Sequence, residues 1–373
     1  MFNFRNLYGS GLTESIPSLC RGLVNAGVET DVYAPRARPE WASEKFTMHV
    51  HPTVPGFASL GWSPRMHSAI RQMATNCGLI HSHEIWTLPG HYASRVARKA
   101  DVPCVISPRG TLSVVARSYS GWKKRLMWRW LRERDVMSAT CLHATAEHER
   151  EDIRALGYEG PIAVIPNAVP MPLQKPEREH RKLRRLVYLA RIHPIKGTQV
   201  LVDLWRNLAT EFPDWELDIA GVDDGGHVAK LKAHAAKLKL KRITFSGPRF
   251  GEEKSRFLFS ADLYCLPTTS DNFAITVGEA LAHQLPVVTT KATPWEGVVT
   301  HRCGWWEEPN SEAVGRALRQ AMAKSHDELE EMGLRGKHWV SNDFGINPLG
   351  QRMSDLYQWL IFGGEAPHFI SFS

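Results

Sequence analysis

Two patterns of apolar and polar positions alternate along the chain. Short runs rich in β-branched residues alternate with longer stretches in which apolar residues recur every three or four positions, the spacings of buried strands and of amphipathic helices. Strand-then-helix alternation of this kind produces parallel sheets covered on both faces. In the first half it predicts strands at Val28–Ala34, Leu79–His81, Cys104–Ser107, Cys141–Ala144 and Ile162–Ile165, and helices at Thr13–Asn25, His91–Lys99, Trp122–Met137 and Glu147–Leu156. In the second half it predicts strands at Leu186–Ala190, Glu216–Ala220, Ile243–Ser246, Leu263–Leu266 and Val287–Thr290, and helices at Thr198–Leu208, Val228–Leu238, Glu252–Ser260 and Thr276–His283.

The alternation breaks once, at Pro166–Lys182, where prolines and charges follow one another without a period. Such a stretch is typical of an interdomain linker. We therefore predict two doubly wound, Rossmann-like α/β domains facing a cleft, with ligands at the carboxyl ends of the strands. The predicted boundaries are 1–166 for the first domain, 167–183 for the linker and 184–350 for the second domain. Residues 351–373 form a helix and tail that we expect to pack back on the N-terminal domain.

Composition places the chain among ordinary globular proteins. Of its 373 residues, 43% are hydrophobic and 23% charged, values that argue against a disordered or fibrous chain. No apolar run approaches the roughly 20 residues that span a bilayer, and no signal-peptide pattern opens the chain. The six cysteines are scattered without a C-x-x-C pair, as expected of reduced thiols. These features predict a cytoplasmic protein.

The net charge of +7 lies wholly in the first 178 residues, because the remainder carries equal numbers of basic and acidic residues. The two halves should therefore have different partners.

Candidate chemistry is densest in Ser270–Val288, "SDNFAITVGEALAHQLPVV". A polar loop with Asp271 follows a predicted strand, and a helix begins near Ile275. The free N–H groups of a helix start favour an anion such as phosphate. Asp271 and Glu279, eight residues apart, could then accept hydrogen bonds from sugar hydroxyls. The alternative from spacing alone is a capping Asp and a solvated helix Glu.

A second stretch, "YLARIHPIKG", delivers two cations into the loop after a buried strand. Arg191 and Lys196 could grip a diphosphate, the guanidinium in bidentate fashion and the ammonium as a point charge. The alternative is that each is a surface charge. His193 between them is assigned no role.

The segments "ARIHPIKG", "VIPNAV", "FSGPRFGEEK" and "SDNFAITVGEALAHQLPVVTTKATPW", with "LIHSHEIWTLPG", "VISPRGTL" and "LHATAEHERE" in the first half, together resemble retaining glycosyltransferases of family 4, which have the GT-B fold. The resemblance extends over nearly the whole chain. It implies a nucleotide-diphosphate sugar as donor, bound mainly by the second domain. It also implies an acceptor held by the first domain, and neither a cofactor nor a required metal.

By position, the resemblance assigns residues as well. Arg191 and Lys196 match the diphosphate-binding pair, and together with Asp271, at the sugar, they are the expected catalytic residues. Glu279 matches the residue at the nucleotide ribose. The other expected donor-binding residues are Phe273, Ala274 and Asn167, and the acceptor-side candidates are Gly11, His83 and Arg109.

Several positions depart from the family pattern. Asp271 replaces the usual Glu, Ala274 replaces the usual Gly and restricts the backbone, and His283–Gln284 replaces a small residue and Gly. Many relatives have His where this chain has Arg109, which cannot act as a base but could hold an acceptor phosphate or the donor diphosphate. The first strand is confined to Phe2–Leu7, short for the family.

One basic stretch, Trp122–Arg134, has Trp and Leu at every fourth position and six basic residues around them. As an amphipathic helix it could lie on an anionic membrane, which would suit a lipid-linked acceptor. The alternative is that its apolar face packs on the domain and its charges are solvated. His81 and His83 have no third ligand in view, so a metal site is not expected.

The leading prediction is a hexosyltransferase that moves a sugar from a nucleotide-diphosphate sugar to a saccharide or polyprenyl-linked acceptor. We expect it to act in surface polysaccharide or lipopolysaccharide biosynthesis, at the inner face of the membrane. The alternatives are an epimerase or phosphorylase of the same fold and, from another class, a basic nucleic-acid-binding protein. No nucleic-acid-binding signature and no G-x-G-x-x-G dinucleotide motif is present, so no nucleic acid partner is expected.

Overall fold

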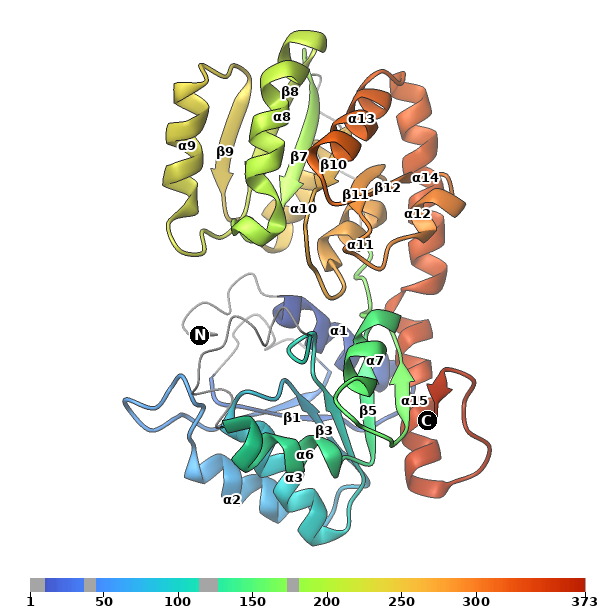
Figure 1. Cartoon of the computed structure of the whole chain (residues 1–373). Coiled ribbons are helices and arrows are strands. Elements are labelled where there is room, and N and C mark those ends of the chain that lie inside the picture. The colour runs from blue at the N-terminus through green and yellow to red at the C-terminus, as the bar shows by residue number, and fades with distance from the viewer. Residues whose placement is uncertain (1–10, 37–44, 114–126, 173–180, 373) are drawn as a thin grey trace. The chain divides into compact units, whose positions relative to one another are not determined.

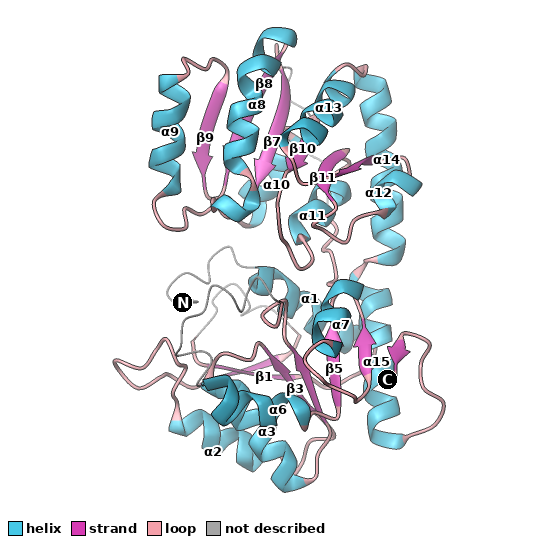
Figure 2. Cartoon of the chain, in the orientation of Figure 1, coloured by secondary structure: helices cyan, strands magenta, loops and turns pink. Residues whose placement is uncertain are grey.

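The computed structural model describes residues 11–36, 45–113, 127–172 and 181–372. The described residues form two compact units, each a parallel sheet with helices on its faces (Figures 1 and 2). The N-terminal unit comprises Ser15–Ala168 and Ile346–Ser373, and the C-terminal unit comprises Val169–Gly345 with residues 11–14. The α/β prediction is confirmed.

The C-terminal unit begins inside the segment that the sequence suggested as a linker. Val169 is fully buried in its core, and the Val169 N–H donates to the Phe344 carbonyl at 2.8 Å. At the other end the unit stops at Gly345, ahead of the expected residue 350, because the last long helix, α15 (Ile346–Phe362), groups with the N-terminal unit.

The N-terminal unit contains a five-stranded sheet in the order β13-β6-β5-β4-β3, parallel except for β13. A separate parallel pair, β1-β2, accompanies it. The strands are β1 (Asp31–Ala34), β2 (Thr47–Val50), β3 (Ile80–His83), β4 (Cys104–Ser107), β5 (Cys141–Ala144), β6 (Ile162–Val164) and β13 (Ile370–Ser371). Its helices are α1 (Gly11–Asn25), α2 (Pro64–Met73), α3 (Leu88–Ala100), α6 (Glu133–Met137), α7 (Glu147–Arg154) and α15, with a π-helical turn η3 (Trp128–Arg132).

Three elements of this unit escaped the sequence pattern, β2, α2 and β13. The α2 helix starts on a strong local signal, because the Ser63 hydroxyl caps the Met66 N–H and Pro64 occupies the first turn. The predicted strand at Leu79–His81 instead runs on to His83 as β3, which brings His83 to the carboxyl edge of the sheet. The expected strand at Phe2–Leu7 lies outside the described residues.

The C-terminal unit contains a six-stranded parallel sheet in the order β12-β11-β10-β7-β8-β9. The chain starts in the middle at β7, winds to one edge through β8 and β9, and returns to the other side of β7 through β10. In such sheets ligands bind at the switch point, here between β7 and β10. The strands are β7 (Arg184–Leu189), β8 (Trp215–Ala220), β9 (Ile243–Gly247), β10 (Leu263–Leu266), β11 (Val287–Thr290) and β12 (Gly304–Glu307). The helices are η4 (Pro194–Lys196, 3-10), α8 (Thr198–Glu211), α9 (His227–Lys237), α10 (Gly251–Phe259), α11 (Ile275–Ala282), α12 (Gly297–Thr300), α13 (Ser311–Met322) and α14 (His326–Asp343).

Large aromatic side chains fill this second core. Trp205, Trp215 and Trp295 are fully buried, as are Tyr188 and Tyr264 on the central strands β7 and β10. The hydroxyl of Tyr264 donates to the Leu189 carbonyl, 3.0 Å away. The backbone ends of β7 and β10 are therefore held together from within, at the place where the candidate loops begin.

The basic stretch Trp122–Arg134 differs from the packed-face alternative in its described part, which starts at Met127. Trp130, placed on the packing face by its spacing, is 75% exposed. Arg132, placed among the solvated charges, is buried, pairs with Asp135 at 3.2 Å and donates to the Thr87 carbonyl. The reason is the π-helical turn Trp128–Arg132, which shifts the register of the faces relative to a regular helix. No described helix is both long and apolar enough to cross a bilayer.

Candidate active site

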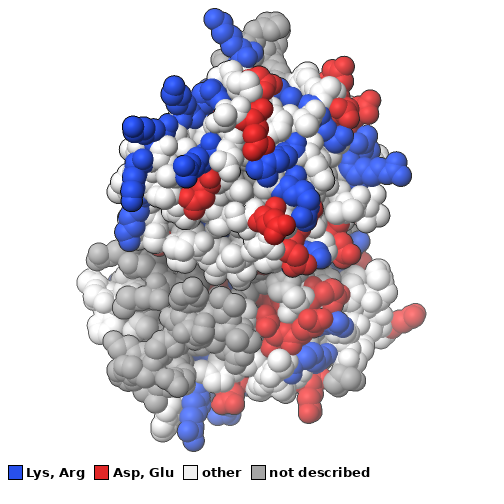
Figure 3. All heavy atoms as spheres, turned by 45° about the horizontal axis from the view of Figure 1, so that its top comes forward, with Lys and Arg blue, Asp and Glu red and all other residues white. Residues whose placement is uncertain are grey.

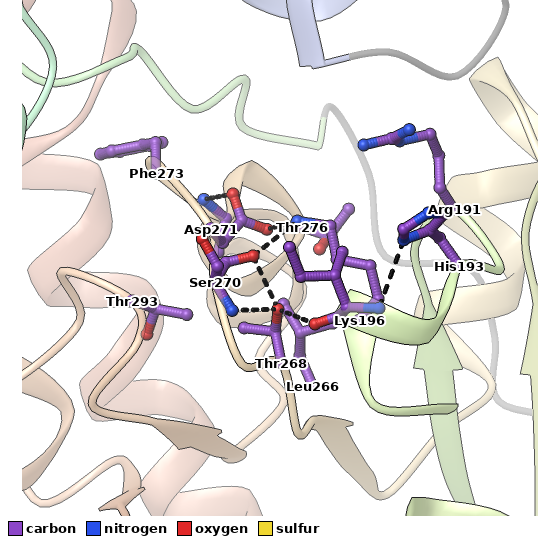
Figure 4. A network of polar contacts seen from close by, with 12 residues as sticks. Arg191, His193, Lys196, Leu266, Thr268, Ser270, Asp271, Phe273, Thr276 and Thr293 are labelled. Atoms are coloured by element: carbon purple, nitrogen blue, oxygen red, sulfur yellow. Dashed lines mark hydrogen bonds and ion pairs between the residues drawn. The ribbon is translucent and has the colours of Figure 1, made fainter. Parts of the chain in front are cut away.

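The C-terminal unit gathers most of the predicted donor residues at its switch point. Arg191 and Lys196 lie in the loop after β7, and the loop after β10 carries Asp271 into the start of α11 (Figure 4). Since β7 and β10 are neighbours in the sheet, residues 75 positions apart in the sequence come into hydrogen-bond contact.

Lys196 and Asp271 form a largely buried ion pair, with side chains 11% and 19% exposed. The Lys196 Nζ lies 2.6 Å from Asp271 Oδ2 and also donates to the Ser270 carbonyl at 3.3 Å. Gly197, directly after Lys196, makes the pair possible: its φ is +73°, and a Cβ there would lie 1.8 Å from the Pro267 carbonyl oxygen. A close backbone approach between the two loops thus requires glycine.

Asp271 also organises its own loop. Its Oδ1 accepts the Ala274 N–H at 2.9 Å. Burial opposes the charge of Asp271, but the Lys196 ammonium and the backbone N–H groups of Ala274 and Phe273 outweigh it and hold the pKa of the carboxyl below its usual value. The Asp271 carboxyl is therefore ionised at neutral pH.

The start of α11 completes this edge. Ala274 caps the helix in the left-handed conformation, at φ +54° and ψ +57°, which is costly for a residue with a Cβ. The first N–H groups of a helix have no partner within it and attract anions. Phe273 is buried beside Ala274, and its carbonyl accepts the Trp295 indole N–H at 2.6 Å. Because the Phe273 and Ala274 N–H groups donate to Asp271, it is the first-turn N–H groups of α11 beyond them that can face a ligand.

Arg191 stands apart from Lys196. No dashed line joins its guanidinium to the Lys196–Asp271 pair in Figure 4, and it lies 2.7 Å from Asp224 Oδ2. Both partners are about 40% exposed, so the ion pair is weak and a stronger anion could replace Asp224. Arg191 and Lys196 thus lie at the same edge of the sheet but pair with different carboxylates, Asp224 and Asp271.

Glu279 lies one turn further along α11 and is buried. Lys254 of α10 donates to it at 2.7 Å and to Glu14 at 3.0 Å. Burial raises the pKa of the Glu279 carboxyl, and Lys254 only partly offsets this. Burial disfavours the Lys254 ammonium, but the two carboxylates outweigh it and raise its pKa. Sequence reasoning missed Lys254, although it ends the quoted segment "FSGPRFGEEK".

Three further predicted residues meet in the N-terminal unit. Arg109, just after β4, has φ +58° and donates to Asn167 Oδ1 and, at 3.2 Å, to His83 Nδ1. Asn167, assigned above to the donor, therefore contacts an acceptor-side candidate. Gly11 is the first residue of α1 and groups with the C-terminal unit.

Behind this cluster runs a buried chain of hydrogen bonds that sequence reasoning missed. His81 contacts the Tyr357 hydroxyl and Ser107 Oγ, at 2.5 and 2.6 Å. Ser107 Oγ also contacts His143 Nδ1 at 2.6 Å. Burial lowers the pKa of His81 and His83, and that of His143 to about 3, so the rings are neutral at physiological pH. Within the described part of the chain, no three His, Cys, Asp or Glu side chains are placed to share a metal ion.

Surface charge is mixed on the face shown in Figure 3. Lys and Arg gather along the edge of the C-terminal unit where α9 lies, with Asp and Glu interspersed over the rest. The exposed lysines of this edge are Lys230, Lys232, Lys237, Lys239 and Lys241. The C-terminal unit, whose part of the sequence has no net charge, thus carries a locally cationic edge on its described surface.

Comparison with known proteins gives a consistent result for both units. Residues 10–168 match the family model described as "Glycosyl transferase 4-like domain", and residues 172–339 match "Glycosyl transferases group 1". An uncharacterised glycosyltransferase of Haemophilus influenzae is 30% identical over 44% of this chain and 46% of its own. The lipopolysaccharide core biosynthesis mannosyltransferase LpsB of Rhizobium meliloti is 29% identical over 46% and 50%.

Among solved structures, Anabaena Alr3699/HepE in complex with UDP and glucose superimposes with a TM-score of 0.71, at 18% identity, over 93% of this chain and 95% of that one. This likeness extends to both units of the fold, whereas the chain spans about half the length of the two curated relatives. Taken with the two family models and the doubly wound sheets, it shows that this chain belongs to the family 4 glycosyltransferases of the GT-B fold.

Proposed function

We propose that this protein is a retaining hexosyltransferase that moves a sugar from a nucleotide-diphosphate sugar to a hydroxyl of a saccharide or lipid-linked acceptor. The observation that carries the proposal is the buried Lys196–Asp271 pair at the switch point, beside the start of α11. A cation, a carboxylate and free N–H groups there match the phosphate and hydroxyl groups of such a donor.

In this proposal Lys196 exchanges partners when the donor arrives. Its ammonium, now 2.6 Å from Asp271, turns to the diphosphate, and Asp271 Oδ2 is released to accept hydrogen bonds from the sugar. Arg191 exchanges Asp224 for the diphosphate in the same way. Glu279, held by Lys254, accepts from the nucleotide ribose. Each cation exchanges one anionic partner for another, and Asp271 keeps the Ala274 N–H while it gains sugar hydroxyl donors, so no buried charge is left without a partner.

The transfer itself breaks the bond between the anomeric carbon and the diphosphate oxygen. The acceptor oxygen bonds to that carbon from the same face, and its proton passes to the departing diphosphate. Lys196 and the α11 N–H groups stabilise the negative charge that develops on the diphosphate, which is the largest contribution expected from a preorganised site. Atoms and charges balance without a protein nucleophile or a metal ion.

The acceptor and pathway follow from a relative. LpsB is a lipopolysaccharide core biosynthesis mannosyltransferase, and the likeness supports a role in lipopolysaccharide or surface polysaccharide synthesis. We place the reaction on the cytoplasmic side of the membrane, where nucleotide sugars are made. An epimerase or phosphorylase would use the same donor site, and the product distinguishes them.

The test is thermal unfolding of the full chain with UDP, GDP, ADP and CMP and their sugars, with EDTA present. A nucleotide at about 100 times its dissociation constant stabilises the folded state by roughly 2.7 kcal/mol. We expect one nucleotide family to raise the Tm, and the double variant Lys196→Met/Asp271→Asn to lose that shift. The double variant keeps the site free of an unpaired buried charge.

The donor that binds is then used for product analysis by NMR. A new glycoside whose anomeric configuration equals that of the donor supports the proposal. An inverted anomer, a free epimer or a sugar phosphate contradicts it, and so does activity that disappears with EDTA.

A further inference from the structure

A second polar site lies at the carboxyl edge of the N-terminal sheet. Its members come from three separate places: His83 ends β3, Arg109 follows β4, and Asn167 lies just beyond β6. In parallel sheets this edge is where ligands bind. Arg109 holds a left-handed φ of +58°, a strained conformation of the kind found at functional sites.

Hydrogen-bond accounting gives this site a definite chemical character. A guanidinium can only donate, so His83 accepts through Nδ1 and carries its proton on Nε2. The Asn167 oxygen is likewise occupied by Arg109. The acceptor atoms involved in these contacts are thus used within the cluster, and the groups left over are N–H donors: the His83 Nε2–H, the Asn167 amide N–H groups and the rest of the Arg109 fork.

Arg109 is also under-satisfied. Among the residues that the structure describes, two of its nitrogens have partners, and its Nε is buried without one. Among the described residues no carboxylate lies within ion-pair distance of the guanidinium. A buried N–H without a partner is costly, which a ligand oxygen would relieve.

The nearest acidic groups, Glu149 and Glu84, only partly offset the burial of Arg109, which lowers the pKa of its guanidinium to about 10. Glu149 accepts from the Gly110 N–H and, at 2.7 and 2.9 Å, from the N–H and hydroxyl of Thr145. Burial raises the pKa of Glu84 to about 7, against the opposing effect of Arg109, so its negative charge is incomplete at neutral pH. The site is therefore electropositive and rich in donors.

We propose that Arg109, His83 and Asn167 bind an oxyanion, a phosphate or carboxylate group carried by the acceptor substrate. The identification as acceptor rests on the proposed function; the oxyanion site itself rests on the donors alone. A transferase with this site prefers an acidic acceptor to its neutral counterpart.

The test measures the Tm of the full chain in chloride buffer at constant ionic strength, titrated with inorganic phosphate, glucuronate or neutral glucose. We expect phosphate, glucuronate or both to raise the Tm by about 2–4 °C at five times the dissociation constant, and glucose to have no effect. Arg109→Gln should abolish the rise, and Arg109→Lys should retain part of it. The exposed Arg134→Gln serves as the control for a generic loss of charge.

A second variant keeps the test decisive if Arg109→Gln folds poorly. Asn167→Asp places a carboxylate against the guanidinium, so it should raise the Tm without added anion and remove the anion response. Persistence of the full response in Asn167→Asp or in Arg109→Gln overturns the proposal, as does a response in the wild type no larger for the anions than for glucose.

The donor site also binds anions in the proposed function, so the titration is repeated in Lys196→Met/Asp271→Asn. A response that survives there and disappears in Arg109→Gln supports the oxyanion site. A response lost in the double variant and kept in Arg109→Gln places the anion at the donor loop and overturns the inference while leaving the proposed function intact. The Tm titrations with UDP, GDP, ADP and CMP test the proposed function separately.

Discussion

Lys196 and Arg109 each follow an inner strand of a parallel sheet, one in each unit, but their surroundings differ. Lys196 is paired at 2.6 Å with a buried carboxylate, whereas Arg109 contacts two neutral side chains and leaves its Nε unpartnered. The first cation keeps its paired carboxylate until a ligand competes for it, whereas the second has no carboxylate within ion-pair distance among the described residues, and a ligand can supply one. The comparison suggests that donor binding proceeds by exchange of partners and anion binding in the N-terminal unit by addition.

The largest expected effect comes from removing one half of the compensated pair. Lys196→Met should lower kcat by about 10²–10³-fold, the usual cost of losing one preorganised group that stabilises developing charge. It should also destabilise the fold by about 3–5 kcal/mol, because Asp271 is left buried and unpaired. Turnover and urea unfolding are the measurements.

The double variant Lys196→Met/Asp271→Asn sharpens this prediction. It should recover most of the stability but none of the activity. If the single variant is as stable as the wild type, the pair is not desolvated as the structure indicates. A matched loss from Arg109→Gln would erase the contrast between the two sites, because among the described residues no carboxylate forms an ion pair with Arg109 and would lose its partner.

A second prediction concerns the glycine that lets the donor loops meet. Gly197→Ala should cost more than about 2 kcal/mol and abolish the nucleotide shift, since the new Cβ would collide with the Pro267 carbonyl. Gly226→Ala is the control: its φ is a similar +76°, but nothing lies within 4 Å of a Cβ. We expect only about 1–2 kcal/mol there, from the left-handed backbone alone. Equal costs for both variants would contradict the steric argument.

Acidic pH should lower the stability of the two units to different extents. The lowered pKa values of His81, His83 and His143 mean that the unfolded chain binds protons below about pH 6.5 while the folded unit does not. The N-terminal unit therefore loses stability as pH falls from 6.5. Protonation of Glu84, whose pKa is about 7, opposes this over pH 4.5–7, but one group does not offset three.

The C-terminal unit behaves differently. The stability contributed by Asp271 is full above its unfolded pKa, near 3.9, and is lost only as pH falls through the lower folded value. Burial lowers the pKa of His283 to about 4. This is one strongly shifted histidine, compared with three in the N-terminal unit. Hydrogen exchange at pH 7.5 and 5.5 should show β4 and β5 losing protection before β7 and β10. The reverse order would show that the histidine chain is not neutral in the fold.

The smallest effect should come from the cap of α11. Ala274→Gly removes a methyl group from a left-handed residue, so the relief of strain should exceed the extra entropy that glycine loses on folding by about 1 kcal/mol or less. Ala236→Gly, on the exposed face of α9, should instead destabilise by about 1 kcal/mol. Thermal unfolding measures both, and a loss of stability in Ala274→Gly would mean that the methyl group contributes packing.

The order of strands and helices was largely accessible from the sequence, because apolar periodicity directly reflects which face of an element is buried. The helix start predicted near Ile275 and the loops that carry Lys196 and Asp271 follow from it. The segments missed or misplaced had weak or misleading periods: β2 is four half-exposed residues, and the π-helical turn at Trp128–Arg132 moved Arg132 inward and Trp130 outward.

The sequence by itself determined the two α/β units, the family and the residue types at each candidate site, since these depend on local pattern and motif spacing. Only the tertiary structure decided which side chains form ion pairs and hydrogen bonds with one another. It placed Asp271 on Lys196, Lys254 on Glu279, and Asn167 on Arg109, contacts between residues 25 to 75 positions apart. The physical reason is that charge compensation depends on distances of a few ångströms, which the order of strands in a sheet sets and the spacing of residues along a chain does not.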